Sequence, residues 1–375
     1  MNLQTKGEDE MRVLILSNNA AGLMSLREEL ITALTELWEV FVCVPPDDYS
    51  KQIEKTGAKL IELSFDRRGK NIIGELSLMK NYKRLIHENN PEIVLTYTIK
   101  PNIYGGIASR LSKTPYIINV TGLGTELQSN SLFSKFLFRL YVFSARKATK
   151  VFVQNSSIKE CFNKMRVIKN CDMLPGSGVN LEKHSLETYP SEDNGLRFLF
   201  IGRVMKDKGI EELIYAARKV HESHNNVTFD LIGYYDESEY KEQIDELIRL
   251  GIMKFFPFQE DIHDVIKDHH CIIHPSYHEG MSNALLEAAA VGRPVIASNI
   301  PGCKETFEDK VTGIAIKVRD KEDLVRGIED LLSLTKSERE QMGKKGRKKV
   351  ESFFDRKIII DKYIDEIKKI EGAIG

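Results

Sequence analysis

The chain lacks most of the features that mark secreted and membrane-spanning proteins. Its 375 residues include five cysteines, none of them in a Cys-x-x-Cys pair. Their odd number and wide spacing argue against a disulfide framework and favour reduced thiols in a cytosolic protein. No run of about 18 uninterrupted apolar residues occurs, so no membrane-spanning helix is expected. The first residues are polar and acidic, unlike a secretion signal.

The chain also lacks an excess of charge of either sign. Its formal net charge is -1, which argues against a dedicated nucleic-acid binder. The average hides one strongly basic region, because residues 93–159 contain a single acid, Glu126. The cations of this region are Lys100, Arg110, Lys113, Lys135, Arg139, Arg146, Lys147, Lys150 and Lys159.

Two short motifs of nucleotide-dependent enzymes are missing as well. The loop after the first apolar run contains no Gly-x-Gly-x-x-Gly, so the dinucleotide fingerprint is absent. No Asp-x-Asp occurs anywhere, and we therefore expect neither a metal nor another cofactor.

What the chain does contain is a regular alternation of short apolar runs and helical segments. This pattern predicts an α/β fold with parallel, doubly wound sheets. We expect strands near residues 12–17, 40–44, 59–63, 93–97, 116–120 and 151–154, and again near 197–202, 227–232, 253–258, 271–274, 294–298 and 313–317. Two Rossmann-like domains follow from this, at 11–180 and 196–354, joined by a polar linker at 181–195.

The most informative stretch runs from His274 to Gly302. A buried-strand run ends at His274, a polar loop continues to Ser282, and an Ala/Leu-rich helix follows. In parallel sheets, ligands bind where loops leave the carboxyl ends of strands, and helix amino ends attract anions. The loop is therefore expected to bind a phosphate. For His274 itself, we expect a ring that is hydrogen-bonded to the backbone.

Two carboxylates lie in this stretch. Glu279 is on the loop, whereas Glu287 lies about one turn inside the helix, with Asn283 four residues earlier on the same face. A carboxylate at that place can accept two hydrogen bonds from a vicinal diol such as a ribose. On the residues alone, Glu287 can equally be a helix-dipole charge, and Glu279 a solvated loop residue.

The spacing of these carboxylates carries a family resemblance. Glu279 and Glu287, with seven residues between them, resemble the E-x7-E motif of the retaining glycosyltransferases of family 4, which have the GT-B fold. Residues 202–209, Gly-Arg-Val-Met-Lys-Asp-Lys-Gly, resemble the G-R-x-x-x-x-K-G element of the same family. Residues 99–106 and 121–124 are similar to bacterial transferases that act on undecaprenyl-diphosphate-linked sugars.

The resemblance implies two Rossmann-like domains facing a cleft, with a last helix at 355–375 that returns to complete the first domain. It places the donor site in the second domain, where Arg203 and Lys208 would neutralise the leaving diphosphate and Glu279 would face the donor sugar. The residues expected to bind the donor are Gly22, Gly280, Met281, Ser282, Asn283, Glu287 and Phe258, with backbone N–H groups of residues 280–282 on the phosphate. Phe258 can equally be a core residue, and Gly22 a glycine that permits a turn.

The acceptor is expected in the first domain. The candidates for it are Arg67, Arg68, Lys100, Asn119 and Thr121. Paired arginines match the oxygens of a diphosphate, although the loop that holds them can also be a solvated basic loop. Many family members place a histidine beyond the strand at 116–120, and this chain departs from them with Asn119 and Thr121.

The segment 132–150 mixes aromatic residues with cations. Lys135, Arg139, Arg146 and Lys150 are expected on one side of a helix and most of the aromatic residues elsewhere. Such a helix can lie on an anionic membrane. It can also be a core helix with a basic outer edge, and both descriptions can hold in part.

Together these features predict a retaining glycosyltransferase that moves a hexose or N-acetylhexosamine from a UDP-sugar to an undecaprenyl-diphosphate-linked acceptor in surface glycan biosynthesis. It would work in the cytoplasm, peripherally on the inner face of the membrane, without metal or nucleic acid. Two alternatives remain on sequence grounds, a UDP-N-acetylglucosamine 2-epimerase of the same fold and a non-catalytic nucleotide-binding protein.

Overall fold

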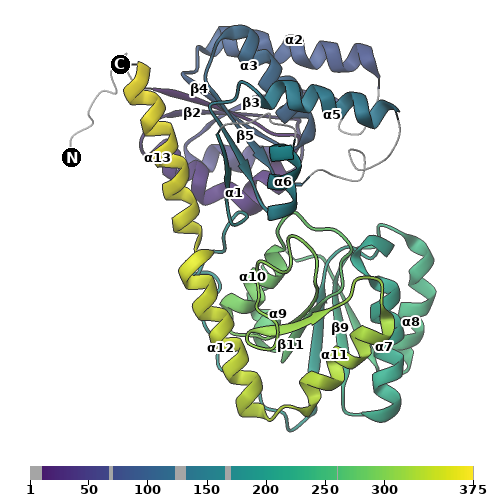
Figure 1. The fold of residues 1–375 in the computed structure, drawn as a ribbon. Coiled ribbons are helices and arrows are strands. Elements are labelled where there is room, and N and C mark those ends of the chain that lie inside the picture. The colour runs from purple at the N-terminus through teal and green to yellow at the C-terminus, as the bar shows by residue number, and fades with distance from the viewer. Residues whose placement is uncertain (1–10, 67–70, 123–131, 165–169, 260, 375) are drawn as a thin grey trace. The chain divides into compact units, whose positions relative to one another are not determined.

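The computed structural model describes residues 11–66, 71–122, 132–164, 170–259 and 261–374. The chain divides into two compact units (Figure 1). Unit 1 takes the chain up to Leu174 together with the residues from Ile359 onward, and unit 2 takes Pro175–Ile358. Each unit is an α/β domain with a parallel sheet, as the alternating sequence pattern predicts.

Unit 1 contains a seven-stranded sheet in the order β3-β2-β1-β4-β5-β6-β7, and its neighbouring strands are parallel. The strands are β1 (Arg12–Leu16), β2 (Glu39–Val44), β3 (Lys59–Glu62), β4 (Ile93–Tyr97), β5 (Tyr116–Val120), β6 (Lys150–Val153) and β7 (Cys171–Met173). Its helical elements are α1 (Ala20–Thr35), η1 (Ser50–Thr56), α2 (Ile72–Asn89), the π-helical turn η2 (Pro101–Gly105), α3 (Gly106–Ser112), α5 (Leu132–Ala145), α6 (Ser156–Lys164) and most of α13 (Arg356–Ile374).

Both faces of this sheet are covered, which explains why its strands are continuous apolar runs. Val13 and Ile15 of β1 pack into a core shared with α1 and α13, whereas Leu14 and Leu16 pack into a second core with α2, α3, α5 and α6. In α13, residues from Ile359 to Ile370 contribute to the first of these cores. The C-terminal helix is therefore part of unit 1.

Unit 2 contains a six-stranded sheet in the order β10-β9-β8-β11-β12-β13, again with parallel neighbours. The strands are β8 (Arg197–Ile201), β9 (Thr228–Gly233), β10 (Met253–Pro257), β11 (Cys271–His274), β12 (Val295–Ser298) and β13 (Gly313–Ile316). The helical elements are η3 (Lys206–Lys208), α7 (Ile210–Ser223), η4 (Ser238–Tyr240), α8 (Lys241–Arg249), α9 (His263–Lys267), α10 (Asn283–Ala290), α11 (Lys321–Ser333) and α12 (Lys336–Phe353).

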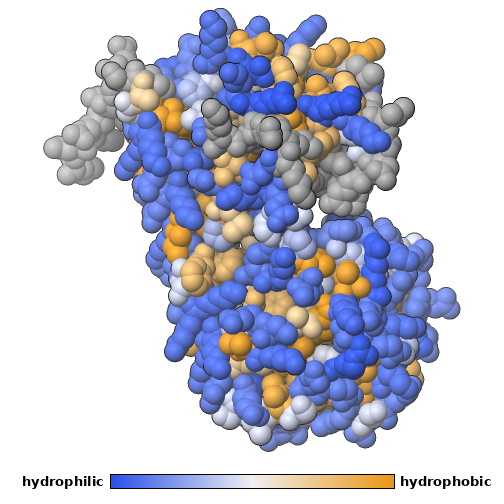
Figure 2. All heavy atoms as spheres, viewed as in Figure 1, coloured by the Kyte–Doolittle hydropathy of each residue, from blue (hydrophilic) through white to orange (hydrophobic). Residues whose placement is uncertain are grey.

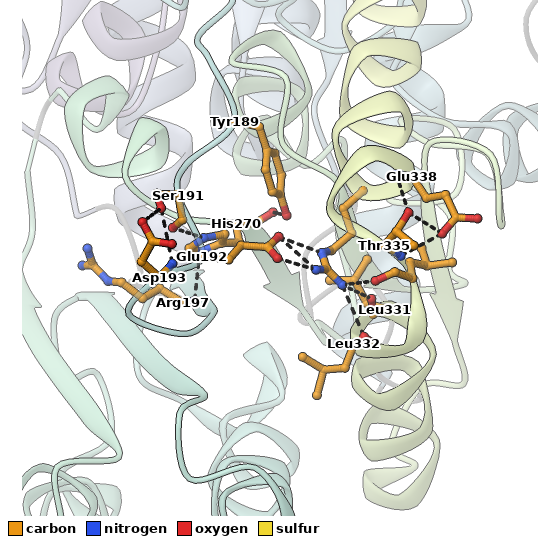
Figure 3. Close-up of polar contacts among 12 residues, drawn as sticks. Tyr189, Ser191, Glu192, Asp193, Arg197, His270, Leu331, Leu332, Thr335 and Glu338 are labelled. Carbon is orange, nitrogen blue, oxygen red and sulfur yellow. Dashed lines mark hydrogen bonds and ion pairs between the residues drawn. The ribbon is translucent and has the colours of Figure 1, made fainter.

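The polar segment 181–195, expected to be a linker, is packed within unit 2 (Figure 3). The Tyr189 hydroxyl donates to the carbonyl of His270 at 3.1 Å. The Arg339 guanidinium, on α12, binds both carboxylate oxygens of Glu192 at 2.9 and 2.8 Å and donates to the carbonyl of Leu331 at 3.0 Å. The segment is polar because it supplies partners to a buried arginine.

Replacing Arg339 by methionine is expected to lower the free energy of unfolding by about 3 kcal/mol, because the change strips a buried carboxylate and several carbonyls of their donor. The matched control is Arg326→Met, which removes an exposed ion pair to Asp323 and is expected to cost about 0.5 kcal/mol. Urea titrations of both variants measure the two costs. Equal costs would show that the Arg339 contacts do not hold the segment.

None of the helices among the described residues is long and apolar enough to cross a membrane.

Candidate active site

The site lies where the strand order of unit 2 reverses, between β8 and β11. These two strands are hydrogen-bonded neighbours, with Ile272 opposite Leu199 and Ile273 opposite Phe200. Their carboxyl ends are therefore adjacent, and so are the loops that follow them. In open α/β sheets, such a reversal point is where ligands bind. The two motifs that are far apart in the sequence thus share one edge of the sheet.

Close backbone contacts join the two loops. Gly209 has φ +73°, and a Cβ atom there would lie 2.3 Å from the carbonyl oxygen of Pro275. The Tyr277 N–H donates to the carbonyl of Asp207 at 2.9 Å. Only glycine provides both this conformation and this approach, so Gly209 fixes the distance between Lys208 and the loop after β11.

Lys208, Glu279 and His274 form the centre of the site. Glu279 Oε1 lies 2.5 Å from Lys208 Nζ and 2.8 Å from His274 Nε2. The Lys208 and Glu279 side chains are only 19% and 12% exposed. The expectation that backbone groups satisfy His274 is wrong, because its Nε2 also lies 3.2 Å from Ser276 Oγ and 3.1 Å from Ser282 Oγ.

This arrangement keeps Glu279 ionised. Burial alone would raise the pKa of its carboxyl, but the hydrogen bond and charge of His274 and the charge of Lys208 outweigh burial and hold the pKa well below its ordinary value of 4.5. A fixed negative charge in a site that is largely shielded from solvent can stabilise positive charge that develops on a bound substrate.

Tyr277 and Glu212 are site-supporting residues that sequence reasoning missed. The Tyr277 hydroxyl lies 2.8 and 2.9 Å from the two carboxylate oxygens of Glu212 on α7, and both residues are buried. The Arg319 guanidinium lies 4.7 Å from the centre of the Tyr277 ring. These contacts tie the middle of the Glu279 loop to α7. The sequence carries no signal for them, since Glu212 resembles any acid in a first helical turn.

The amino end of α10 corrects one expectation and leaves two open. Ser282 caps the helix, because its Oγ accepts from the Leu285 N–H at 3.4 Å. Its own N–H donates to the carbonyl of Gly302 at 2.9 Å and is therefore already engaged, contrary to the predicted phosphate contact. The Met281 side chain is buried in a core cluster with Leu286. Backbone contacts from Gly280 and Met281 to a phosphate remain predictions.

Asn283 and Glu287 lie one turn apart on α10. The Asn283 Oδ1 atom is buried and has no hydrogen-bond partner among the described residues. Burial raises the pKa of the Glu287 carboxyl to about 7, against the opposing charges of Arg356 and Lys183. A buried acceptor oxygen without a donor, one helical turn from a carboxyl group, suits a ligand that brings hydroxyl groups.

Arg203 and Phe258 lie at the carboxyl edge of the same sheet. Arg203 follows β8, and its Nη1 pairs with Asp236 Oδ2 at 2.7 Å. Phe258 follows β10 and is 60% exposed. The alternative that Phe258 is a core residue is therefore wrong. The exposed Tyr234, directly after β9, is a second aromatic residue at this edge that the sequence did not single out.

The predicted acceptor residues of unit 1 that the structure describes lie at or after the carboxyl ends of the neighbouring strands β4 and β5. The amide of Asn119 is buried, donates to the carbonyl of Thr96 at 3.1 Å and accepts from the Tyr363 hydroxyl. Asn119 is therefore a structural residue, which corrects its assignment to the acceptor. Lys100 pairs with Glu75 at 2.5 Å. Thr121 directly follows β5 and is half-buried.

Three further predicted site residues, Gly22, Arg67 and Arg68, belong to the first part of the chain. Gly22 is in the first turn of α1, not in the preceding loop, and its N–H donates to the capping Asn19 side chain. Its N–H is thus already engaged, and a contact of Gly22 with the donor remains a prediction. Arg67 and Arg68 lie outside the described residues.

The segment 132–150 is a helix only as far as Ala145, where α5 ends. Lys150 begins β6 and pairs with Asp172 at 2.7 Å, so it does not belong to the basic face that the sequence predicts. On α5, Leu137 and Tyr141 are buried in the core, whereas Phe136 and Phe143 are 54% and 43% exposed.

Within the parts of the chain that the structure describes, no three His, Cys, Asp or Glu side chains converge as metal ligands would.

Comparisons with known proteins agree with the fold. Residues 184–349 match the family model "Glycosyl transferases group 1", and residues 12–155 match "Glycosyl transferase 4-like". The chain is 27% identical over 348 residues to the N,N'-diacetylbacillosaminyl-diphospho-undecaprenol alpha-1,3-N-acetylgalactosaminyltransferase of Campylobacter jejuni, covering 86% of this chain and 89% of that protein.

Two further similarities cover most of the chain. It is 24% identical over 277 residues to the UDP-Gal:alpha-D-GlcNAc-diphosphoundecaprenol alpha-1,3-galactosyltransferase of Escherichia coli, covering 70% of this chain and 71% of that protein. The crystal structure of Anabaena Alr3699/HepE in complex with UDP and glucose has the same fold, with a TM-score of 0.79, 20% identity and coverage of 96% and 99%. With matched family models in both units and this shared fold, the chain belongs to the family 4 glycosyltransferases of the GT-B fold and is a glycosyltransferase.

Proposed function

We propose that the chain transfers a hexose or an N-acetylhexosamine from a UDP-sugar to an undecaprenyl-diphosphate-linked sugar, in surface glycan biosynthesis and with retention of the donor's anomeric configuration. The proposed binding of a UDP-sugar donor rests on the Lys208–Glu279 pair, which lies where the strand order of the unit 2 sheet reverses. The acceptor class is supported by the names of the two relatives, which both contain a diphospho-undecaprenol or diphosphoundecaprenol sugar.

In this proposal, Lys208 and Arg203 supply the positive charge for the departing diphosphate, and no metal is needed. Both cations are ion-paired in the ligand-free chain, Lys208 with Glu279 and Arg203 with Asp236. A bound diphosphate would compete with these carboxylates for the two cations. Because the cations are held in place beforehand, little reorganisation is needed when charge builds on the leaving group.

The nucleotide would lie along the carboxyl edge of the unit 2 sheet. Glu287 and Asn283 would bind the ribose hydroxyls, since Asn283 Oδ1 has no donor among the described residues and the Glu287 carboxyl lies one turn further along the same helix. Phe258 would offer its exposed ring to the base.

This assignment predicts pH-dependent donor binding. The Glu287 pKa of about 7 means that the carboxyl is largely protonated below pH 7 and ionised above it. Since the ionised form accepts both ribose hydroxyls, the affinity for a UDP-sugar should rise by up to about tenfold per pH unit below 7 and level off above it. Calorimetric titration between pH 6 and 8 measures this slope. Glu287→Gln should bind weakly with a flat profile, and a flat profile in the unaltered chain would contradict the role of Glu287.

A UDP-release assay tests the proposed reaction. Purified protein is given a panel of UDP-sugars with and without an undecaprenyl-diphosphate-sugar lipid fraction. Lipid-dependent release with one donor is expected and would identify the sugar. Lipid-independent conversion of UDP-N-acetylglucosamine to its 2-epimer would instead support the isomerase, and no release with any donor and lipid would refute the proposal.

We further propose that unit 1 binds the cytoplasmic face of an anionic membrane through its α5 surface. This surface consists of the exposed residues Lys135, Phe136, Arg139, Phe143 and Arg146 of α5 and its C-terminal turn. Figure 2 shows hydrophobic residues among hydrophilic ones on this part of unit 1. Cations can reach lipid phosphates while the two phenylalanines enter the acyl boundary.

Two further helices of unit 1, α2 and α3, also carry exposed apolar residues. Ile73 and Leu76 of α2 are 77% and 50% exposed, and Leu111 of α3 is 55% exposed. The Arg110 guanidinium stacks 4.0 Å from the centre of the Phe143 ring, which keeps a cation beside this aromatic residue. An acceptor anchored in the membrane would then approach unit 1 from this side.

The triple variant Lys135→Gln, Arg139→Gln, Arg146→Gln should weaken partitioning onto anionic vesicles by about 10²-fold, since each cation contributes about 1 kcal/mol near such a surface. Vesicle co-sedimentation with and without phosphatidylserine measures this. Its matched control is Lys344→Gln, Lys345→Gln, Lys348→Gln, which removes three exposed cations of α12 in unit 2. If both triple variants partition like the unaltered chain, the α5 surface does not bind the membrane.

A further inference from the structure

His274 links three parts of the site. It is the last residue of β11 and is 3% exposed. Its Nε2 reaches Glu279 on the loop, Ser276 beside it, and Ser282 at the amino end of α10. The ring therefore connects Glu279 to the sheet and to the start of the helix, both of which are rigid elements.

The neighbours of His274 define what its ring does. An ionised carboxylate only accepts hydrogen bonds, so Nε2 must carry the proton that points at Glu279. The two serine hydroxyl oxygens can share the same proton as acceptors. The other ring nitrogen, Nδ1, is buried and has no hydrogen-bond partner among the described residues. The polar contacts of the ring with Glu279, Ser276 and Ser282 thus converge on Nε2.

Lys208 and His274 both contact the Oε1 atom of Glu279, but they differ in the other groups that they bind. If the proposed function is right, on which this inference rests, Lys208 must also serve the diphosphate. His274 is the last residue of β11, and among the described residues its ring pairs with no other charged side chain. Another titratable group near Glu279, the buried Cys303 after β12, has a thiol pKa raised well above its ordinary value by burial, and secondarily by the charge of Glu279. It stays neutral and cannot replace the lysine.

We propose that His274 is a positioning residue, which holds the Glu279 carboxylate in place and ionised through Nε2–H while Lys208 engages the diphosphate of the donor. Without it, the Glu279 carboxylate would lose this hydrogen bond while it lies buried next to an anionic ligand, and both conditions favour its protonation.

Two substitutions of His274 that both introduce a side-chain amide distinguish a positioning role from a packing role. Glutamine can place its amide N–H₂ near the position of Nε2, whereas the shorter asparagine reaches only as far as Nδ1. His274→Gln should therefore keep kcat within about threefold of the unaltered chain, and His274→Asn should lower kcat by about 10- to 100-fold with little change in the KM of the donor. A merely structural role would lower thermal stability without separating the two variants in kcat.

A second readout needs no substrate and therefore stands even if the proposed function fails. Lys208→Met mimics the state in which the lysine is engaged elsewhere. In full-length protein labelled with 13C at glutamate carboxyls, Lys208→Met alone should keep the Glu279 pKa at or below its ordinary value of 4.5. The double variant Lys208→Met, His274→Asn should raise it above that value, and Lys208→Met, His274→Gln should not; Glu279→Gln assigns the signal.

The same pKa of Glu279 in the asparagine and glutamine double variants would overturn the inference. If the unaltered chain transfers no sugar but the two double variants differ as expected, the positioning role stands and the proposed function falls. If transfer occurs and His274→Asn matches His274→Gln in kcat, the positioning role falls and the proposed function stands.

Discussion

Replacing Glu279 by glutamine is expected to lower kcat for sugar transfer by about 10³-fold or more. Glutamine keeps the size of the side chain but removes the negative charge that His274 and Lys208 hold in a site where the carboxylate is 12% exposed. If that charge faces the donor sugar, it stabilises the positive charge that develops at the anomeric carbon as the diphosphate departs. The measurement is the rate of lipid-dependent UDP release at saturating donor.

The fold and the nucleotide site provide the controls for this variant. Glu279→Gln should bind UDP and unfold near the temperature of the unaltered chain, because Glu279 lies on a loop and a glutamine of the same size can still bond to Lys208 or His274. Glu222→Gln removes an exposed carboxylate that pairs with Lys219 and should leave kcat unchanged. Near-normal transfer by Glu279→Gln would remove Glu279 from the active site.

Replacing Lys208 by methionine is expected to lower kcat by about 10²- to 10³-fold and to raise the KM of the donor. Methionine fills a similar volume but cannot balance the charge of the leaving diphosphate. Lys208→Arg should recover only part of the activity, because the planar guanidinium does not fit a position set by the close approach of Gly209 to Pro275.

The matched control lies two residues away. Lys206 belongs to the same short helix η3, but its side chain is 59% exposed and its Nζ lies 3.3 Å from Glu211 rather than in the site. Lys206→Met should therefore transfer sugar at nearly the normal rate. Similar kinetics for the two methionine variants would mean that Lys208 does not bind the diphosphate.

The fold was predictable because the sequence pattern is strong and local. Both sheets are covered on both faces, so most strands are short apolar runs flanked by helical periodicity. The exception is β7, which has three residues at the edge of its sheet, two of them exposed, and therefore no apolar run to recognise. The segment 181–195 was predicted to be a linker because it is polar. Its polar groups instead bind a buried arginine on α12, which is distant in the sequence.

The site was predictable only where a motif carries it. The spacing of two family motifs singled out Lys208 and Glu279 as candidates. The contact between them depends on the pairing of β8 with β11, which no motif shows. The roles of His274 and Tyr277 depend on the same long-range register, and no local pattern reveals them. Asn119 was wrongly assigned to the acceptor. It lies near the carboxyl end of β5, where ligands often bind, but its partner Tyr363 is 244 residues later in the chain and cannot be foreseen from local sequence.

The central claim is that sugar moves from a UDP-sugar to a lipid-linked acceptor. The most direct test incubates the full-length protein with the donor identified by UDP release and a defined undecaprenyl-diphosphate-sugar, followed by mass spectrometry of the extracted lipid. The account predicts a lipid that is heavier by one hexose or N-acetylhexosamine residue, with none formed by Glu279→Gln. UDP release with no sugar added to the lipid would contradict it.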